Sequence, residues 1–305
     1  MAQLPNGKWS GVAWQGLRFR IPFDWNPLEI TGVRAKGALR IGTLERTTME
    51  VIWQSPGRFD TNRRVWNRYL KQLRIKSREA SKHRANCFKY TDALRHTGWR
   101  QPIAIRLDDD DRTSSIHMLM QGIHTDRFIL IRMALDQGKN EKHTVDSILA
   151  SLRETDPSSR ESWSIYGFSV QVPEGANLVD AQMQPGHLRL RFRCRLIAMT
   201  WQRISFGQRT LSGQSLGDWH SQQILEKRKR RPWRPGPSVA RGGHSLRRVS
   251  VISRVMPRPW RKQARSAAWH EKDSDQLVLL TVKGCFDRVD SIFTEIGESW
   301  RVAGE

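Results

Sequence analysis

The sequence contains little of what several protein classes require. Its three cysteines, Cys87, Cys194 and Cys285, lie far apart and form no CxxC pair. Disulfide frameworks and zinc modules need closely spaced cysteines, so the sequence favours neither. No apolar run approaches the roughly 18 to 20 residues of a membrane span, and the first residues contain no signal-like apolar segment. We therefore expect a soluble protein of a reducing, cytoplasmic compartment, without a membrane span.

The common signatures of catalysis are also missing, including the phosphate-cradling, zinc-protease and nucleophile-elbow motifs. His117 and His124 are spaced so that a strand would point them to opposite faces, and we expect one at the core edge and one in a turn. Cys87 lies among basic residues, which could lower its pKa, although a structural thiol is the stronger interpretation. We expect no catalytic residue, no metal and no cofactor, and a protein that is not an enzyme.

Acidic residues are almost absent from two segments, and these segments carry the charge of the chain. The formal net charge is +22. Residues 63–89 contain ten Lys or Arg and one Glu, and residues 220–265 contain fourteen Lys or Arg and one Glu. The remaining basic and acidic residues cancel. The whole excess of positive charge therefore lies in these two basic windows.

The rest of the sequence shows a long internal repeat. In residues 15–41 and again in 166–192, a glycine and a proline six residues apart enclose alternating apolar residues, which predicts a half-buried strand. A second glycine then opens the pattern G-x-L-R, which predicts another strand, and a further strand ends at Trp53 or Trp201. The same order of features in both halves indicates that the chain consists of two similar halves.

The far end of each half repeats as well. Short apolar runs over 126–135 and 275–282 predict strands, and each is followed by the tetrapeptide VDSI. Apolar residues from Val145 and from Val289 recur at i, i+3, i+4 and i+7, so each tetrapeptide begins an amphipathic closing helix. Because solenoid repeats are only about 20 to 50 residues long, a repeat of this length indicates a tandem domain duplication.

A stretch rich in proline, serine and charge at 154–162 predicts a linker between the halves. We expect a first domain over 1–157 with a basic helical insertion at 61–89. A second domain is expected over 158–305, with a basic insertion at 220–265 that we expect to be flexible.

The order of elements resembles the PsbP-like superfamily, which includes an extrinsic protein of photosystem II and a Ran-binding nuclear import factor. The features that carry the resemblance are the openings GLRFRIP and GFSVQVP, the late strands RFILIRMAL and QLVLLTV, and the closing helices VDSILASL and VDSIFTEIGESW. The resemblance implies an α+β fold in which each domain is an antiparallel sheet flanked by helices, an α/β/α sandwich. It also implies a noncatalytic protein that docks onto larger assemblies. No functional residue is carried over from the family.

Both basic windows occupy the same place in the repeat. In the first, an apolar stripe from Val65 to Leu73 predicts a helix that seats on the sheet and turns its basic residues outward. The second begins with a weaker helical pattern around Trp219 and then becomes rich in proline, glycine and like charges, which oppose compact structure. Duplication predicts that the two windows form one broad positive region.

Such a region attracts polyanions, because Lys and Arg that neutralise phosphates release condensed counterions. Trp233 and Trp260 add aromatic planes that could stack on unpaired bases. Trp14, Trp53, Trp163 and Trp201, by contrast, are expected in the core at corresponding places of the two halves.

We therefore expect a noncatalytic protein that binds a polyanionic partner, with nucleic acid as one candidate. The alternatives are an adaptor that docks onto an acidic protein surface and an enzyme with a site between the domains. The residues expected to make the contact are Arg64, Arg68, Lys71, Arg74, Arg78, Lys227, Arg228, Lys229, Arg230, Arg231, Trp233, Arg234, Arg247, Arg248, Arg258, Trp260 and Arg261.

Overall fold

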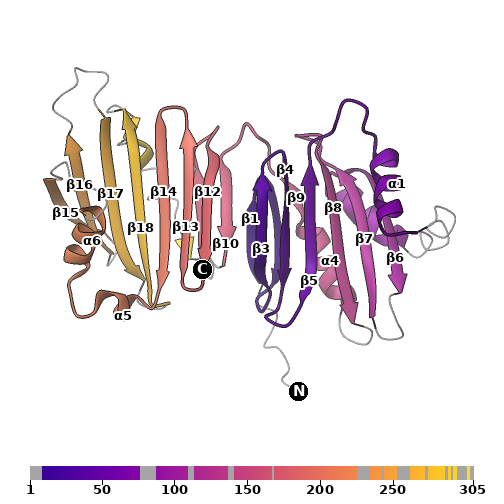
Figure 1. Cartoon of the computed structure of the whole chain (residues 1–305), viewed down its shortest axis with the longest axis horizontal. Coiled ribbons are helices and arrows are strands. Elements are labelled where there is room, and N and C mark those ends of the chain that lie inside the picture. The colour runs from indigo at the N-terminus through magenta and orange to yellow at the C-terminus, as the bar shows by residue number, and fades with distance from the viewer. Residues whose placement is uncertain are drawn as a thin grey trace. The chain divides into compact units, whose positions relative to one another are not determined.

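The fold is described by a computed structural model (Figure 1). No helix among the described residues is long and apolar enough to cross a membrane. The structure describes residues 9–75, 87–108, 113–136, 141–166, 168–225, 234–241, 244–252, 262–271, 274–285, 288–289, 291–293 and 301–302.

The chain divides into two compact units. Unit 1 comprises Met1–Val170 together with Arg301–Glu305, and unit 2 comprises Gln171–Trp300. Part of the segment 154–162, which was expected to be a linker, is strand. Glu154 pairs with Leu17, and residues 161–162 begin a strand that pairs with the first strand of the chain. The division between the units falls after this segment.

The first strands of the two halves share one sheet, which we call the opening sheet. In the strand LRFRIP, Leu17, Phe19 and Ile21 are buried and alternate with exposed arginines, as the two-residue periodicity of apolar residues predicted. The first strand pairs with a strand of the second half through Ala13 and Ser164. In spatial order, this sheet contains β19 (Arg301–Val302), β11 (Phe168–Val172), β10 (Glu161–Ile165), β1 (Trp9–Trp14), β2 (Leu17–Pro22) and β9 (Arg153–Glu154).

The main sheet of unit 1 is antiparallel throughout. Its residues alternate between two faces, both of which contain buried side chains such as Leu119 on one face and Met118 on the other. In spatial order, its strands are β3 (Asn26–Val33), β4 (Lys36–Gly42), β5 (Thr47–Gln54), β8 (Phe128–Asp136), β7 (Thr113–Gln121) and β6 (Arg100–Asp108).

The main sheet of unit 2 is also antiparallel. Strand β18 lies between β14 and β17. As expected for a central strand, its Leu277, Val278 and Leu280 are 0% exposed. In spatial order, its strands are β12 (Asn177–Gln184), β13 (His187–Cys194), β14 (Ile197–Ser205), β18 (Gln276–Cys285), β17 (Lys262–Glu271), β16 (His244–Ile252) and β15 (Arg234–Arg241).

The two main sheets have the same connectivity. In each, three strands in chain order are followed by the last, the second-last and the third-last strand of that sheet, and unit 2 adds β15 at the edge. Tandem duplication remains a prediction, and this shared strand order is what supports it.

The two central tryptophans are both buried, at 1% exposure, but they do not occupy equivalent registers. Trp53 lies opposite Gly37, the second residue of β4, whereas Trp201 lies opposite Leu190, the fourth residue of β13. The expected burial of both tryptophans is confirmed, but relative to the glycine that opens G-x-L-R in each half, Gly37 or Gly186, their registers differ by four residues. Gly37 is needed at its site, since a Cβ there would lie 2.4 Å from both the Trp53 ring and the Thr31 carbonyl oxygen.

Helices cover only parts of the sheets. The expected closing helix of the first half is present, and its stripe from Val145 to Leu152 is buried. Its counterpart is described at 288–289 and 291–293, where Val289 and Phe293 are buried. The described helices with assigned bounds are α1 (Asn62–Gln72), α3 (Phe88–His96), α4 (Glu141–Ser151), α5 (Gly207–Leu211) and α6 (Leu216–Leu225).

The expected fold class is wrong. Instead of an α+β protein made of two helix-flanked sandwiches, the chain is mainly β, with three antiparallel sheets and far more strand than helix residues. Two features account for the difference. The first strands of both halves form a sheet of their own, and the second basic window contributes strands where irregular structure was expected.

The flexibility expected of that second window stays a prediction, although its described part is strand. Strands β15 and β16 pair from Arg241 and His244 outward to Arg234 and Ser250, and β16 joins β17 through Val251 and Ala264. Leu246, Val249 and Val251 supply strand-forming residues near the arginines, and the ladder satisfies the backbone polar groups.

Candidate binding surface

The first basic window begins with helix α1, whose ends are fixed by local hydrogen bonds. The Thr61 hydroxyl accepts a hydrogen bond from the Arg64 backbone N–H at 3.3 Å, which caps the first turn. After the last turn, Arg74 adopts a left-handed conformation with φ 58°, and the Ile75 N–H donates to the Leu70 carbonyl oxygen at 3.0 Å.

The apolar stripe of α1 seats the helix on the main sheet of unit 1, as predicted. Trp66 and Leu70 are 0% and 2% exposed and pack against Ile105, Leu119 and Phe128 of β6, β7 and β8 (Figure 1). The opposite side of the helix is consequently exposed, including Arg64, Arg68 and Lys71 at i, i+4 and i+7.

Helix α1 and the residues that flank it carry six exposed basic residues and one exposed aromatic residue, which we call the α1 surface. The sequence analysis missed Phe59, whose side chain is 71% exposed, and Asp60, which is the one acidic residue between residues 58 and 75. The α1 surface consists of Arg58, Phe59, Arg63, Arg64, Arg68, Lys71 and Arg74.

Two of the arginines of the α1 surface are held in place. Arg64 Nη1 donates to the Phe59 carbonyl oxygen at 2.8 Å, and Arg68 Nη2 lies 3.0 Å from Asp60 Oδ1. The Gly57 backbone N–H and the Arg68 guanidinium lower the pKa of Asp60, so it is charged at neutral pH. Arg58 lies over the Phe59 ring, 5.4 Å from its centroid.

The other predicted contact residues are less fully described. Arg234 on β15 lies opposite Ser250, two residues from Arg248 on β16, and Arg247 lies opposite Ser238. The windows fall in different compact units, so a single broad positive region remains a prediction. Outside the described residues lie Arg78, Lys227, Arg228, Lys229, Arg230, Arg231, Trp233, Arg258, Trp260 and Arg261.

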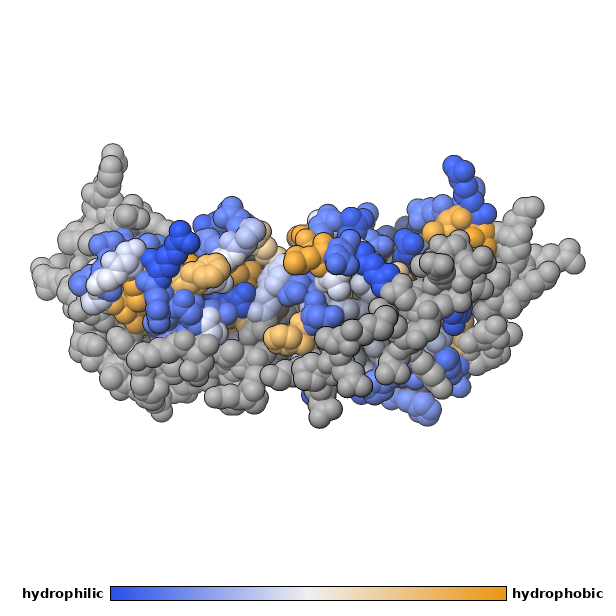
Figure 2. Space-filling model, turned by 90° about the horizontal axis from the view of Figure 1, so that it is seen from below, coloured by the Kyte–Doolittle hydropathy of each residue, from blue (hydrophilic) through white to orange (hydrophobic). Residues whose placement is uncertain are grey.

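On the face drawn in Figure 2, most of the described residues are hydrophilic, and the hydrophobic ones among them form small groups. Exposed large apolar residues such as Phe23, Leu44 and Phe59 are separated in the sequence. Isolated exposed apolar residues are normal on soluble proteins, so charge is the more distinctive property of the described surface.

The two histidines lie where the sequence predicted. His117 is 1% exposed on β7, and its Nδ1 lies 2.5 Å from the Tyr69 hydroxyl of α1, while Nε2 lies 2.9 Å from Ser115 Oγ. His124 is exposed in the turn before β8. Among the described residues there is no group of three or more His, Cys, Asp or Glu that could hold a metal.

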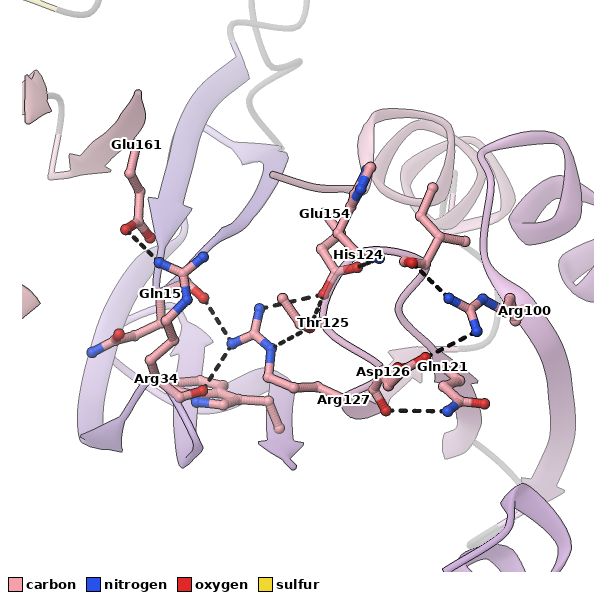
Figure 3. Close-up of polar contacts among 12 residues, drawn as sticks. Gln15, Arg34, Arg100, Gln121, His124, Thr125, Asp126, Arg127, Glu154 and Glu161 are labelled. Carbon is pink, nitrogen blue, oxygen red and sulfur yellow. Dashed lines mark hydrogen bonds and ion pairs between the residues drawn. The ribbon is translucent and has the colours of Figure 1, made fainter. Parts of the chain in front are cut away.

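A buried cluster of charged residues in unit 1 was missed by the sequence analysis (Figure 3). At its centre, Arg127 is 2% exposed, and its Nη1 donates to the carbonyl oxygens of Gln15 and Arg34 at 2.8 and 3.0 Å. Its Nη2 lies 3.6 Å from Glu154 Oε1, and its Nε donates to the Thr125 hydroxyl at 2.9 Å.

The second carboxylate of this cluster is Glu161, which accepts a hydrogen bond from Arg34 Nη1 at 2.9 Å. Burial raises the pKa of Glu161, and the guanidinium groups of Arg34 and Arg127 oppose this rise. Burial also lowers the pKa of Arg127, opposed by Glu154. The cluster joins the β1–β2 turn, the β3–β4 turn and β9, so its geometry is that of a structural clamp.

No local pattern could have revealed this clamp, because Arg127 and Gln15 are 112 residues apart in the sequence. The structure favours the structural interpretation of Cys87 over a lowered pKa. Its thiol is buried, and burial raises its pKa despite the nearby cations of Arg106 and Lys89. A raised thiol pKa disfavours the reactive thiolate.

Comparisons with known proteins give the following. No family model matches the sequence, and no curated protein matches it. The Saccharomyces cerevisiae Ran-binding protein Mog1p is 12% identical with a TM-score of 0.35, over 48% of this chain and 96% of its own. The immunity protein TplEi of the Pseudomonas aeruginosa T6SS, complexed with "L" peptide, is 11% identical with a TM-score of 0.35, over 97% of this chain and 99% of its own.

A chain of the Tle4–Tli4 complex is also 11% identical with a TM-score of 0.35, over 97% of this chain and 97% of its own. A Ran-binding protein is thus among the similar structures. These TM-scores are too low to carry an argument about fold or function.

Proposed function

We propose that the protein is a noncatalytic binding protein that docks onto an acidic protein surface through the α1 surface. The observation that carries this proposal is the stripe formed by Arg64, Arg68 and Lys71, which faces outward beside the exposed ring of Phe59. Arginine and aromatic side chains are enriched at the centres of protein interfaces, where they supply most of the binding free energy.

The rigidity of the α1 surface supports a specific partner. Trp66 and Leu70 fix the helix to the sheet, and Asp60 and the Phe59 carbonyl oxygen orient two of the arginines. A side chain that is already ordered loses less conformational entropy on binding. Arg68 is 57% exposed, so part of its guanidinium remains accessible to a partner carboxylate.

The exposed aromatic residue suits a protein partner. Arg58 lies over one face of the Phe59 ring, which leaves less ring surface for base stacking. A ring with one side covered can still insert its edge into an apolar pocket of a protein. The surface therefore combines a cationic stripe with one apolar anchor.

The test is affinity capture of partners from nuclease-treated lysate by the full chain. We expect one acidic protein to be recovered, and we expect Phe59→Ser combined with Lys71→Gln to reduce its recovery at least tenfold, since an anchor and a charge contact together contribute about 2 kcal/mol or more. Arg193 and Arg195, exposed in unit 2, provide a control, and their double replacement by Gln should leave the recovery unchanged.

The purified recovered protein should then bind the full chain in fluorescence anisotropy, with an affinity that falls as salt rises. A single-stranded RNA titrated in parallel serves as the competing class of partner. The proposal is overturned if nuclease abolishes capture, if RNA binds and the α1 substitutions weaken it, or if the α1 and control variants behave alike.

A further inference from the structure

A hollow of about 810 Å³ in unit 1 lies against the opening sheet and α4. The strand register explains why it exists. Gly11 and Ala13 of β1 pair with Arg20 and Arg18 of β2, so these four residues lie on one face of the sheet. The hollow has the size of a small-molecule site, for which about 300 to 1,000 Å³ is typical.

The floor of the hollow consists of small residues from two neighbouring strands. Gly11 and Ala13 on β1 lie beside Ser162 and Ser164 on β10, with Ala13 directly opposite Ser164. Side chains of this size leave space above the strands, although Ala13 and Ser164 are themselves only 4% and 8% exposed. The larger Trp163 points to the opposite face and is 1% exposed. The hollow therefore results from the small residues that the sequence places at these strand positions.

One wall of the hollow is strongly positive. Arg18 lies directly opposite Arg153 of β9, and Arg20 is the next residue on the same face. Like charges directly opposite one another in a sheet repel and destabilise the pair. None of the described residues that line the hollow is acidic, so these three guanidinium groups have no carboxylate there to offset the repulsion.

Hydrogen-bond donors are available beside this wall. Arg153 is oriented by its Nη1, which donates to the carbonyl oxygens of Ala150 and Leu152 at 2.9 and 2.8 Å, and its other N–H groups are not used in these bonds. Ser162 and Ser169 also line the hollow, and no hydrogen bond is described for either hydroxyl among the described residues. Ser164 is different, since its hydroxyl donates to the Gly11 carbonyl oxygen at 2.9 Å.

We propose that this hollow binds an organic phosphate. Guanidinium groups match the oxygens of a phosphate in paired hydrogen bonds, and a dianion can offset more than one of the three positive charges. The hollow is larger than a phosphate ion, and the partly exposed Trp9 lines it. Trp9 gives the ligand's apolar body a surface to rest on, while the phosphate faces Arg18, Arg20 and Arg153.

The test uses phenyl phosphate as the probe, with benzoate as a monoanionic comparison and phenol as a neutral one, in isothermal titration calorimetry of the full chain. We expect saturable binding of phenyl phosphate, weaker binding of benzoate and none of phenol. Arg18→Gln and Arg20→Gln should each weaken phenyl phosphate binding about tenfold, the effect of losing one charge-assisted hydrogen bond. Bound phenyl phosphate should also raise the melting temperature of the wild-type protein.

The control is Arg95→Gln, which removes the same charge from a 60% exposed side chain on α3 and should change the affinity less than twofold. Ser162→Glu, which puts a carboxylate into the hollow, should abolish binding while the circular dichroism spectrum stays that of the wild type. The proposal is overturned if phenyl phosphate shows no saturable binding up to millimolar concentrations. Equal binding of benzoate, or equal effects of the Arg20 and Arg95 substitutions, overturns it as well.

Discussion

Replacing Arg127 by methionine should destabilise unit 1 by about 3 to 5 kcal/mol, because it breaks a buried ion pair and leaves one partner behind. The structure accounts for this magnitude in three parts. The carbonyl oxygens of Gln15 and Arg34 each lose a hydrogen bond, at about 1 kcal/mol apiece. The carboxylate of Glu154, 2% exposed, loses its buried counter-charge, which adds about 1 to 3 kcal/mol.

A second substitution isolates the charge contribution. Glu154→Gln in the Arg127→Met background removes the stranded carboxylate charge, so it should restore about 1 to 3 kcal/mol, although the same substitution destabilises the wild-type protein. Arg95→Met is the matched surface control. Its pair with Asp92 is more than half exposed on both sides, and its loss should cost at most about 0.5 kcal/mol.

The assay is urea-dependent hydrogen exchange of peptides from β2 and β8, which reports the stability of unit 1 without assuming that the two units unfold together. The reasoning is refuted if Arg127→Met is as mild as Arg95→Met. It is also refuted if Glu154→Gln makes the Arg127→Met protein still less stable.

Three further predictions follow from the packing. Trp53→Ala and Trp201→Ala should each cost about 3 to 5 kcal/mol in urea unfolding, because both side chains are 1% exposed. Gly37→Ala should cost about 1 to 3 kcal/mol in the same assay, because a Cβ would press on the Trp53 ring, and a melting temperature equal to that of the wild type would contradict this. Burial raises the pKa of Tyr69 from 10.0 in the unfolded chain to about 12 in the folded protein. The stability that this difference provides is therefore complete below pH 10 and is lost as the pH rises through 12. The stability advantage over Tyr69→Phe should therefore shrink by about 1 kcal/mol between about pH 9 and 11 in urea titrations, after allowance for partial exposure, and an advantage that stays constant would exclude this cause.

Periodicity predicted the local elements well, because burial of one face imposes a pattern on neighbouring residues. The stripe from Val65 to Leu73 and the alternation of Leu17, Phe19 and Ile21 gave the helix and the strand that the structure contains. The fold class was wrong because it depends on which strands pair, and the pairing of Ala13 with Ser164 leaves no trace in either segment alone.

The basic windows illustrate a second limit. Counting charges located the outward stripe of α1, but it did not show that Asp60 holds Arg68 or that Phe59 is exposed beside it. The hollow was missed for the opposite reason. Its arginines come from β2 and β9 and are too few in either stretch to raise the local charge, so only the register of the sheet brings them together.

The pairing of β1 with β10 has a consequence for synthesis of the chain. Residue 13 leaves the ribosome about 150 residues before its partner at position 164, so one edge of the earliest strand waits unpaired while the whole first half is translated. An unpaired edge is a template for pairing with other chains. A nascent chain halted before residue 161 should therefore need a chaperone or associate with its neighbours, and release should follow once β10 has emerged.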